Sequence, residues 1–89
     1  MRVRASMDKM GWIQVVPINK RLAKAMERDA RSNGAPKSFR AEIFLQTESD
    51  IMQFANDYTR IYEDIEQGFD RTYNMDEWEF RQLIGYAKG

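Results

Sequence analysis

Carboxylates are the side chains of this chain that could do chemistry, because it contains 14 Asp and Glu residues but no His and no Cys. Without His it lacks the usual general base at neutral pH, and without Cys it lacks the usual activated nucleophile and the ligands of most zinc sites. Nothing in the spacing of the carboxylates places two of them in one water-excluding pocket, as acid-base catalysis requires. We therefore expect no enzyme, no cofactor and no bound metal.

The segment Asp70–Met75 matches part of a calcium-binding loop, since Asp70, Thr72 and Asn74 fall at its first, third and fifth positions. The glycine of the sharp turn is replaced by Met75, however, and the bidentate glutamate by Arg81. The segment is therefore expected to form a turn that leads into a helix capped by Asn74.

Carboxylates recur every seven residues at Asp50, Asp57 and Asp64, which places them along one line of a predicted helix. One interpretation is a solvated face in which Asp57, Arg60 and Asp64 form a weak ion-pair ladder. The other is an acidic surface that imitates the phosphates of a nucleic acid and binds a basic surface of another protein. The residues predicted to make this contact are Asp57, Glu63, Asp64, Asp76, Glu77 and Glu79.

Basic residues concentrate in the first part of the chain. Residues 1–40 contain ten basic and three acidic residues, whereas residues 41–89 contain four basic and eleven acidic ones, so the two parts carry +7 and −7. Four basic residues advance by three and four positions and form one stripe along a predicted helix. This stripe is a solvated face, a site for DNA or RNA phosphates, or a surface that pairs with the acidic end of a second copy. Its members are Arg21, Lys24, Arg28 and Arg31.

The elements that would position these residues are strands and helices in a mixed order. In chain order, the sequence predicts a strand over 12–16, a helix over 21–32, a strand over 38–46, a long helix over 48–68 and a C-terminal helix capped by Asn74. Pro17 closes the first strand, while Asn19 and Asn33-Gly34 mark the two ends of the first helix. Alternating polarity favours a strand over 38–46, with a helix as the competing interpretation.

This order, β-α-β-α-α, predicts a small α+β domain in which a short two-stranded sheet is covered by the long amphipathic helix and the C-terminal helix. Residues 1–9 show no period and are expected to form a loose N-terminal arm, which leaves residues 10–89 as the domain. Because no disulfide can staple so small a core, a homodimer that extends the sheet is a further expectation. The C-terminal helix is expected to supply apolar residues to the core, namely Trp78, Phe80, Leu83, Ile84 and Tyr86.

Residues 12–45 resemble the ribbon-helix-helix repressors. The resemblance is carried by a short strand closed by Val16-Pro17, a helix ending in Ala30-Arg31-Ser32-Asn33-Gly34, and then Ser38 and Glu42-Ile43. It implies a dimer that lays a two-stranded ribbon in the major groove of DNA, with the outward strand residues reading bases. Of the strand residues, Gln14 is the one able to form the hydrogen bonds that such reading requires.

These observations favour a small non-enzymatic binding protein that acts as a stoichiometric regulator or inhibitor of another protein. Phages and mobile elements make such proteins against host nucleic-acid-handling or defence complexes, in the manner of anti-CRISPR proteins. A dimeric DNA-binding regulator is the first alternative, and a homo-oligomer with charge-paired ends is the second. No apolar run is long enough to cross a membrane, so a cytoplasmic location is expected.

Overall fold

The first nine residues, predicted to be a loose arm, contribute strand β1 (Arg2–Met7) to an antiparallel sheet. The computed structural model describes residues 1–84 of the chain. Within them the remaining strands are β2 (Ile13–Pro17), β3 (Ile43–Leu45) and β4 (Thr72–Asn74), in the order β3-β2-β1-β4. The sheet therefore has four strands instead of the predicted two, and β1 and β2 lie at its centre.

Strand β1 forms because its side chains alternate in polarity. Val3 and Ala5 are buried, whereas Arg2, Arg4 and Ser6 are exposed. This alternation suits a strand with one face on a core and the other in solvent. The prediction of an arm without structure is wrong, because Val3–Met7 pair with β2 and Arg2–Arg4 also pair with β4, which satisfies backbone groups along the strand.

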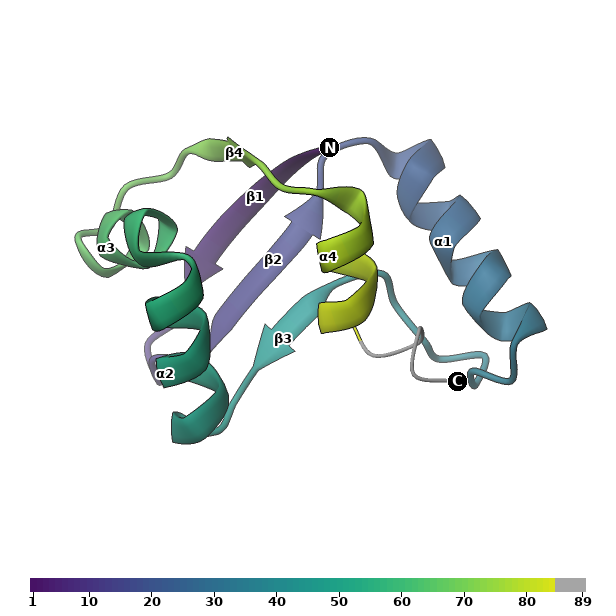
Figure 1. The fold of residues 1–89 in the computed structure, drawn as a ribbon, viewed down its shortest axis with the longest axis horizontal. Coiled ribbons are helices and arrows are strands. Elements are labelled where there is room, and N and C mark those ends of the chain that lie inside the picture. The colour runs from purple at the N-terminus through teal and green to yellow at the C-terminus, as the bar shows by residue number, and fades with distance from the viewer. Residues whose placement is uncertain (85–89) are drawn as a thin grey trace.

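Helices cover one face of this sheet. Those in the described residues are α1 (Lys20–Ser32), α2 (Glu48–Asp57), α3 (Thr59–Glu66) and α4 (Glu77–Leu83). They bring apolar side chains to a common core with the strands, namely Met26, Phe54, Ile61, Ile65 and Phe80. Figure 1 shows α1 at one end of the molecule, α2 and α3 at the other end, and α4 between them. The fold is thus a small α+β domain in which Arg4, Gln14 and Phe44 of the other sheet face are exposed.

The first predicted strand and helix are confirmed nearly to the residue. Helix α1 begins after Asn19, whose side chain accepts hydrogen bonds from the backbone N–H groups of Arg21 and Leu22. It ends before Asn33, and Gly34 adopts a positive φ of 99°. Both ends are therefore set by local chemistry that the sequence displays.

The long helix predicted over 48–68 is interrupted. Tyr58 leaves the helical conformation, with φ −128° and ψ 53°, and separates α2 from α3. The hydroxyl of Thr59 donates hydrogen bonds to the carbonyl groups of Ala55 and Asn56, at 3.1 and 3.3 Å. A side chain that bonds to carbonyls of the preceding turn competes with the helix ladder, which accounts for a break at this position.

The remaining predictions hold in part. The strand predicted over 38–46 is confirmed for Ile43–Leu45, while the residues before it form no regular element. The turn and Asn74 cap predicted after Asp70 are wrong, because Asn74 belongs to β4 and pairs with Arg2 of β1. Helix α4 is instead capped by Asp76. Tyr86, predicted to face the core, lies outside the described residues, and no helix in residues 1–84 is long and apolar enough to cross a membrane.

Candidate functional site

Tyr58 lies where α2 meets α3, and its hydroxyl reaches α4. The hydroxyl donates a hydrogen bond of 2.7 Å to Oε2 of Glu79. Burial raises the pKa of Tyr58 above its usual value, and the hydrogen bond to Glu79 and the charges of Glu79, Asp57 and Asp76 raise it further. We name Asp57, Tyr58, Asp76 and Glu79 the Tyr58 cluster. Three of the six predicted contact carboxylates therefore gather around one phenol.

Helix α4 positions its two members of the cluster through its first turn. Asp76 precedes the helix, and its side chain accepts a hydrogen bond of 3.1 Å from the backbone N–H of Glu79. Phe80 is fully buried and fixes the helix on the core. Carboxylates are stabilised at a helix N-terminus, so this end of α4 holds Asp76 and Glu79 close together without an energetic penalty from the helix dipole.

Asp57 joins the cluster from the C-terminus of α2, whereas Asp76 and Glu79 lie at the N-terminus of α4. It is the last residue of α2, and its carboxylate accepts a hydrogen bond of 3.0 Å from Nε2 of Gln53. The last turn of α2 carries no basic residue. The C-terminus of α2 disfavours a carboxylate here, whereas the N-terminus of α3, which begins at Thr59, favours one, so the two helix dipoles oppose each other at Asp57.

Trp78 extends outward from α4 beside the cluster. Its side chain is 65% exposed, although the sequence predicted it in the core. At about 100° per residue, Trp78 lies on the side of α4 opposite Phe80. The acidic neighbours Glu77 and Glu79 indicate a solvent-facing position, but the apolar side chain of Trp78 favoured a prediction in the core.

The structure places the other three predicted carboxylates elsewhere. Asp64 is partly buried, accepts a hydrogen bond of 2.8 Å from the hydroxyl of Tyr73 and pairs with Arg71. Glu77 pairs with Arg81, which also bonds Asp29 of α1. Glu63 is exposed on α3. No ion pair within the described part of the chain joins Asp57 or Asp64 to Arg60, so the predicted ladder does not form.

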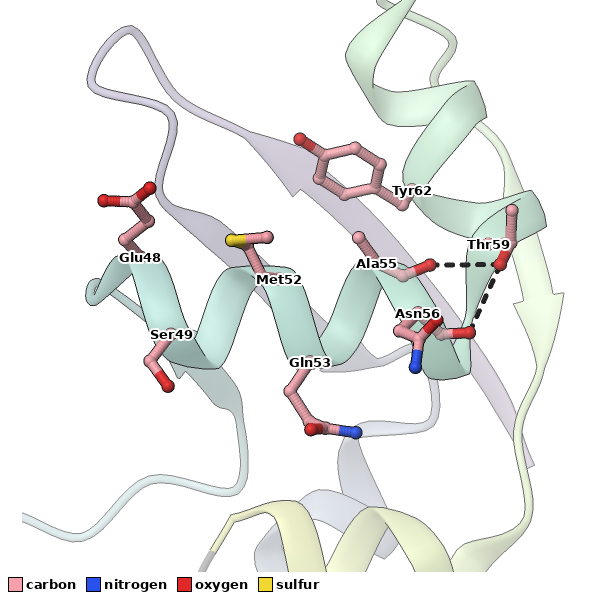
Figure 2. Close-up of a pocket in the computed structure, with 8 residues that line it drawn as sticks. All are labelled: Glu48, Ser49, Met52, Gln53, Ala55, Asn56, Thr59 and Tyr62. Carbon is pink, nitrogen blue, oxygen red and sulfur yellow. Dashed lines mark hydrogen bonds between the residues drawn. The ribbon is translucent and has the colours of Figure 1, made fainter.

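Two open hollows flank α2. One lies beside the Tyr58 cluster and is lined by Asp57, Tyr58, Glu79, Gln82 and Leu83. The other lies along the outer side of α2 and the start of α3. Figure 2 shows that its walls come from both helices, with the Tyr62 ring on the Met52 side of α2. The side chain of Met52 is 64% exposed and gives this second hollow an apolar wall. The residues that line the hollow include one acidic residue, Glu48, and no basic one.

The predicted basic stripe is intact on α1. Arg21, Lys24 and Arg28 are exposed, while Arg31 is partly buried and donates a hydrogen bond to the carbonyl of Lys37. The strand pairing implied by the ribbon-helix-helix resemblance does not fit this sheet, because β2 is an inner strand that already pairs with β1 and β3. It has no free edge on which to form a ribbon with a second copy. Gln14, the expected base reader, donates instead to Glu42 at 2.6 Å.

Residues 1–84 contain no group of three or more His, Cys, Asp or Glu residues that could hold a metal ion. Comparison with models of known protein families, with curated proteins and with solved structures finds no match.

Proposed function

We propose that this chain is a non-enzymatic binding protein that acts as a stoichiometric regulator or inhibitor of a partner protein with a basic surface. The contact surface consists of the Tyr58 cluster and Trp78. One observation carries the proposal: a tryptophan that is 65% exposed sits on a short helix directly between two glutamates and beside the cluster. The partner class is a host protein that handles nucleic acid or takes part in defence, and the chain is of phage or mobile-element type.

The two kinds of side chain would contribute in different ways. Exposed tryptophans supply large, rigid apolar area and are enriched among the residues that dominate binding energy. Carboxylates around such an anchor steer association with a positively charged partner and suppress wrong partners. Spaced on helices, they also imitate nucleic-acid phosphates, which fits a partner whose own ligand is a nucleic acid.

The position of Asp57 supports the same surface. Asp57 is exposed at the break between α2 and α3 and lines the hollow beside Tyr58 and Glu79. Replacing it by lysine removes one of the partner contacts and also the acceptor of the Gln53 side chain. A loss of binding in that variant is assigned to the surface when circular dichroism shows that the helices are retained.

The test is capture of partners from nuclease-treated bacterial lysate by the immobilised chain, quantified by mass spectrometry. We compare the wild type with Trp78→Ala, Asp57→Lys and the matched control Glu48→Lys, which makes the same charge change at the other end of α2. The proposal requires a protein bound at near-equimolar ratio by the wild type and the control and lost in the first two variants. Equal capture by all four chains would overturn it.

A further inference from the structure

One face of helix α1 is uniformly basic. Its members are Lys20, Arg21, Lys24, Arg28 and Arg31, which we name the α1 basic face. At about 100° per residue, these five positions fall within an arc of roughly 100° around the helix, opposite the buried Met26 and Ala30. At about 1.5 Å per residue, the row extends for roughly 16 Å along the helix.

The two acidic residues of α1 lie outside this face, Glu27 at its border and Asp29 well away from it, and both are occupied elsewhere. Glu27 accepts a hydrogen bond of 3.0 Å from the backbone N–H of Ala41. Asp29 pairs with Arg81 of α4 at 3.1 Å. No ion pair among the described residues involves a member of the α1 basic face. The five cations are therefore not neutralised by the chain itself.

From this arrangement we infer that the α1 basic face binds the phosphate backbone of duplex DNA without reading its sequence. Lysine and arginine rows of this kind neutralise phosphates and release counterions, which supplies sequence-independent affinity. A duplex is favoured over a single strand because the face contains no aromatic side chain on which unpaired bases could stack. The inner position of β2 removes the ribbon as a competing way of reading bases.

This surface lies on a different helix from the one proposed for the partner protein, although α4, which carries part of the latter, is joined to α1 by the Arg81–Asp29 ion pair. Helix α1 lies at the opposite end of the molecule from α2 and α3, as Figure 1 shows. The sorting of charge along the sequence thus persists in space. A chain with two such ends could contact a nucleic-acid-binding protein and its DNA at once, but binding through the α1 basic face requires no partner protein.

The test is fluorescence anisotropy of the full chain with a labelled duplex of about 20 base pairs and with one of its single strands, at about 50 and 200 mM salt. For about four phosphate contacts, duplex affinity should fall roughly 100-fold between these salt concentrations. Lys24→Glu/Arg28→Glu should weaken binding by about tenfold or more at the lower salt. The matched control Lys9→Glu/Arg60→Glu makes the same change in net charge outside α1 and should bind within about threefold of wild type.

Three results would overturn the inference: no duplex binding by the wild type at low salt, tighter binding of the single strand, or an equal loss in the control variant. Circular dichroism of both variants establishes that the fold is retained. Light scattering tests whether a second copy of the chain, through its acidic residues, binds the α1 basic face instead of DNA. Dimers that dissociate in high salt and in Lys24→Glu/Arg28→Glu, without duplex binding, would assign the face to self-association.

Discussion

The α1 basic face and the Tyr58 cluster carry opposite charge, but they differ more in how that charge is connected to the fold. Around Tyr58 the Asp76 carboxylate also caps α4, and the Glu79 carboxylate accepts a hydrogen bond from the phenol hydroxyl. On α1 the cations of Arg21, Lys24 and Arg28 form no ion pair in the described chain. The acidic side thus combines surface charge with structural contacts, whereas α1 is held on the core by Met26 and Ala30 and not by its basic residues.

The largest expected effect concerns the anchor of α4. Phe80 is fully buried, and Phe80→Ala should lower the free energy of unfolding by about 3–5 kcal/mol, through lost burial and the cavity left behind. For α1 the equivalent change is Met26→Ala, with an expected loss of about 2–5 kcal/mol. Urea denaturation measures both. A loss well below 1 kcal/mol for Phe80→Ala would show that α4, and the surface it carries, is not held by the core.

A smaller effect is expected where a predicted contact carboxylate is part of the fold. Asp64→Ala removes the acceptor of the Tyr73 hydroxyl and the partner of Arg71, and should lower the free energy of unfolding by about 1–3 kcal/mol. Combining Asp64→Ala with Tyr73→Phe forms a double-mutant cycle that isolates the hydrogen bond. Additive losses in the cycle would argue that Asp64 acts only as surface charge, like the residues of the α1 basic face.

Alkaline pH should weaken the fold through the acidic side. Tyrosine hydroxyls of the unfolded chain ionise near pH 10, whereas burial raises the pKa of Tyr58 in the folded chain. Below about pH 10 the hydroxyl is protonated in both states, and its contribution to stability is fully present. Above this pH the unfolded state loses the proton first, so the free energy of unfolding falls. Urea denaturation from about pH 8 to 11 should show this fall, and Tyr58→Phe should make it less steep. Identical slopes would contradict the shift.

The same contrast explains what the sequence could reveal about the fold. Helix α1 was predictable because Asn19 and Gly34, which are next to it in the sequence, mark its two ends. Strand β1 was not, because its apolar residues are few and small, and it becomes a strand by pairing with residues far along the chain. The break at Tyr58 was hidden for a different reason: the apolar spacing continues through it into α3.

The α1 basic face could be predicted from the sequence, whereas the Tyr58 cluster could not. The α1 basic face follows from spacing on one helix, so its members could be identified directly. Which carboxylates meet at Tyr58 depends on how α4 packs beside α2, and spacing along one helix does not contain that information. Trp78 was accessible to helix geometry, since it lies off the side of α4 that carries Phe80, but its apolar character favoured assignment to the core.

The smallest expected effect has the opposite sign. Lys24 is flanked at helical spacings by Lys20, Arg21 and Arg28, and like charges at such positions destabilise a helix. Lys24→Glu replaces these three repulsions by attractions, against one new repulsion with Glu27, and should raise the free energy of unfolding by about 0.5 kcal/mol, as measured by urea denaturation at low salt. Duplex binding should weaken in the same variant, because a phosphate contact becomes a repulsion. Lys24 would then lower helix stability while raising the affinity for duplex DNA, as expected of a residue whose role is binding. If Lys24→Glu destabilises the chain, the α1 basic face contributes to the fold as the Tyr58 cluster does, and the contrast between the two regions fails.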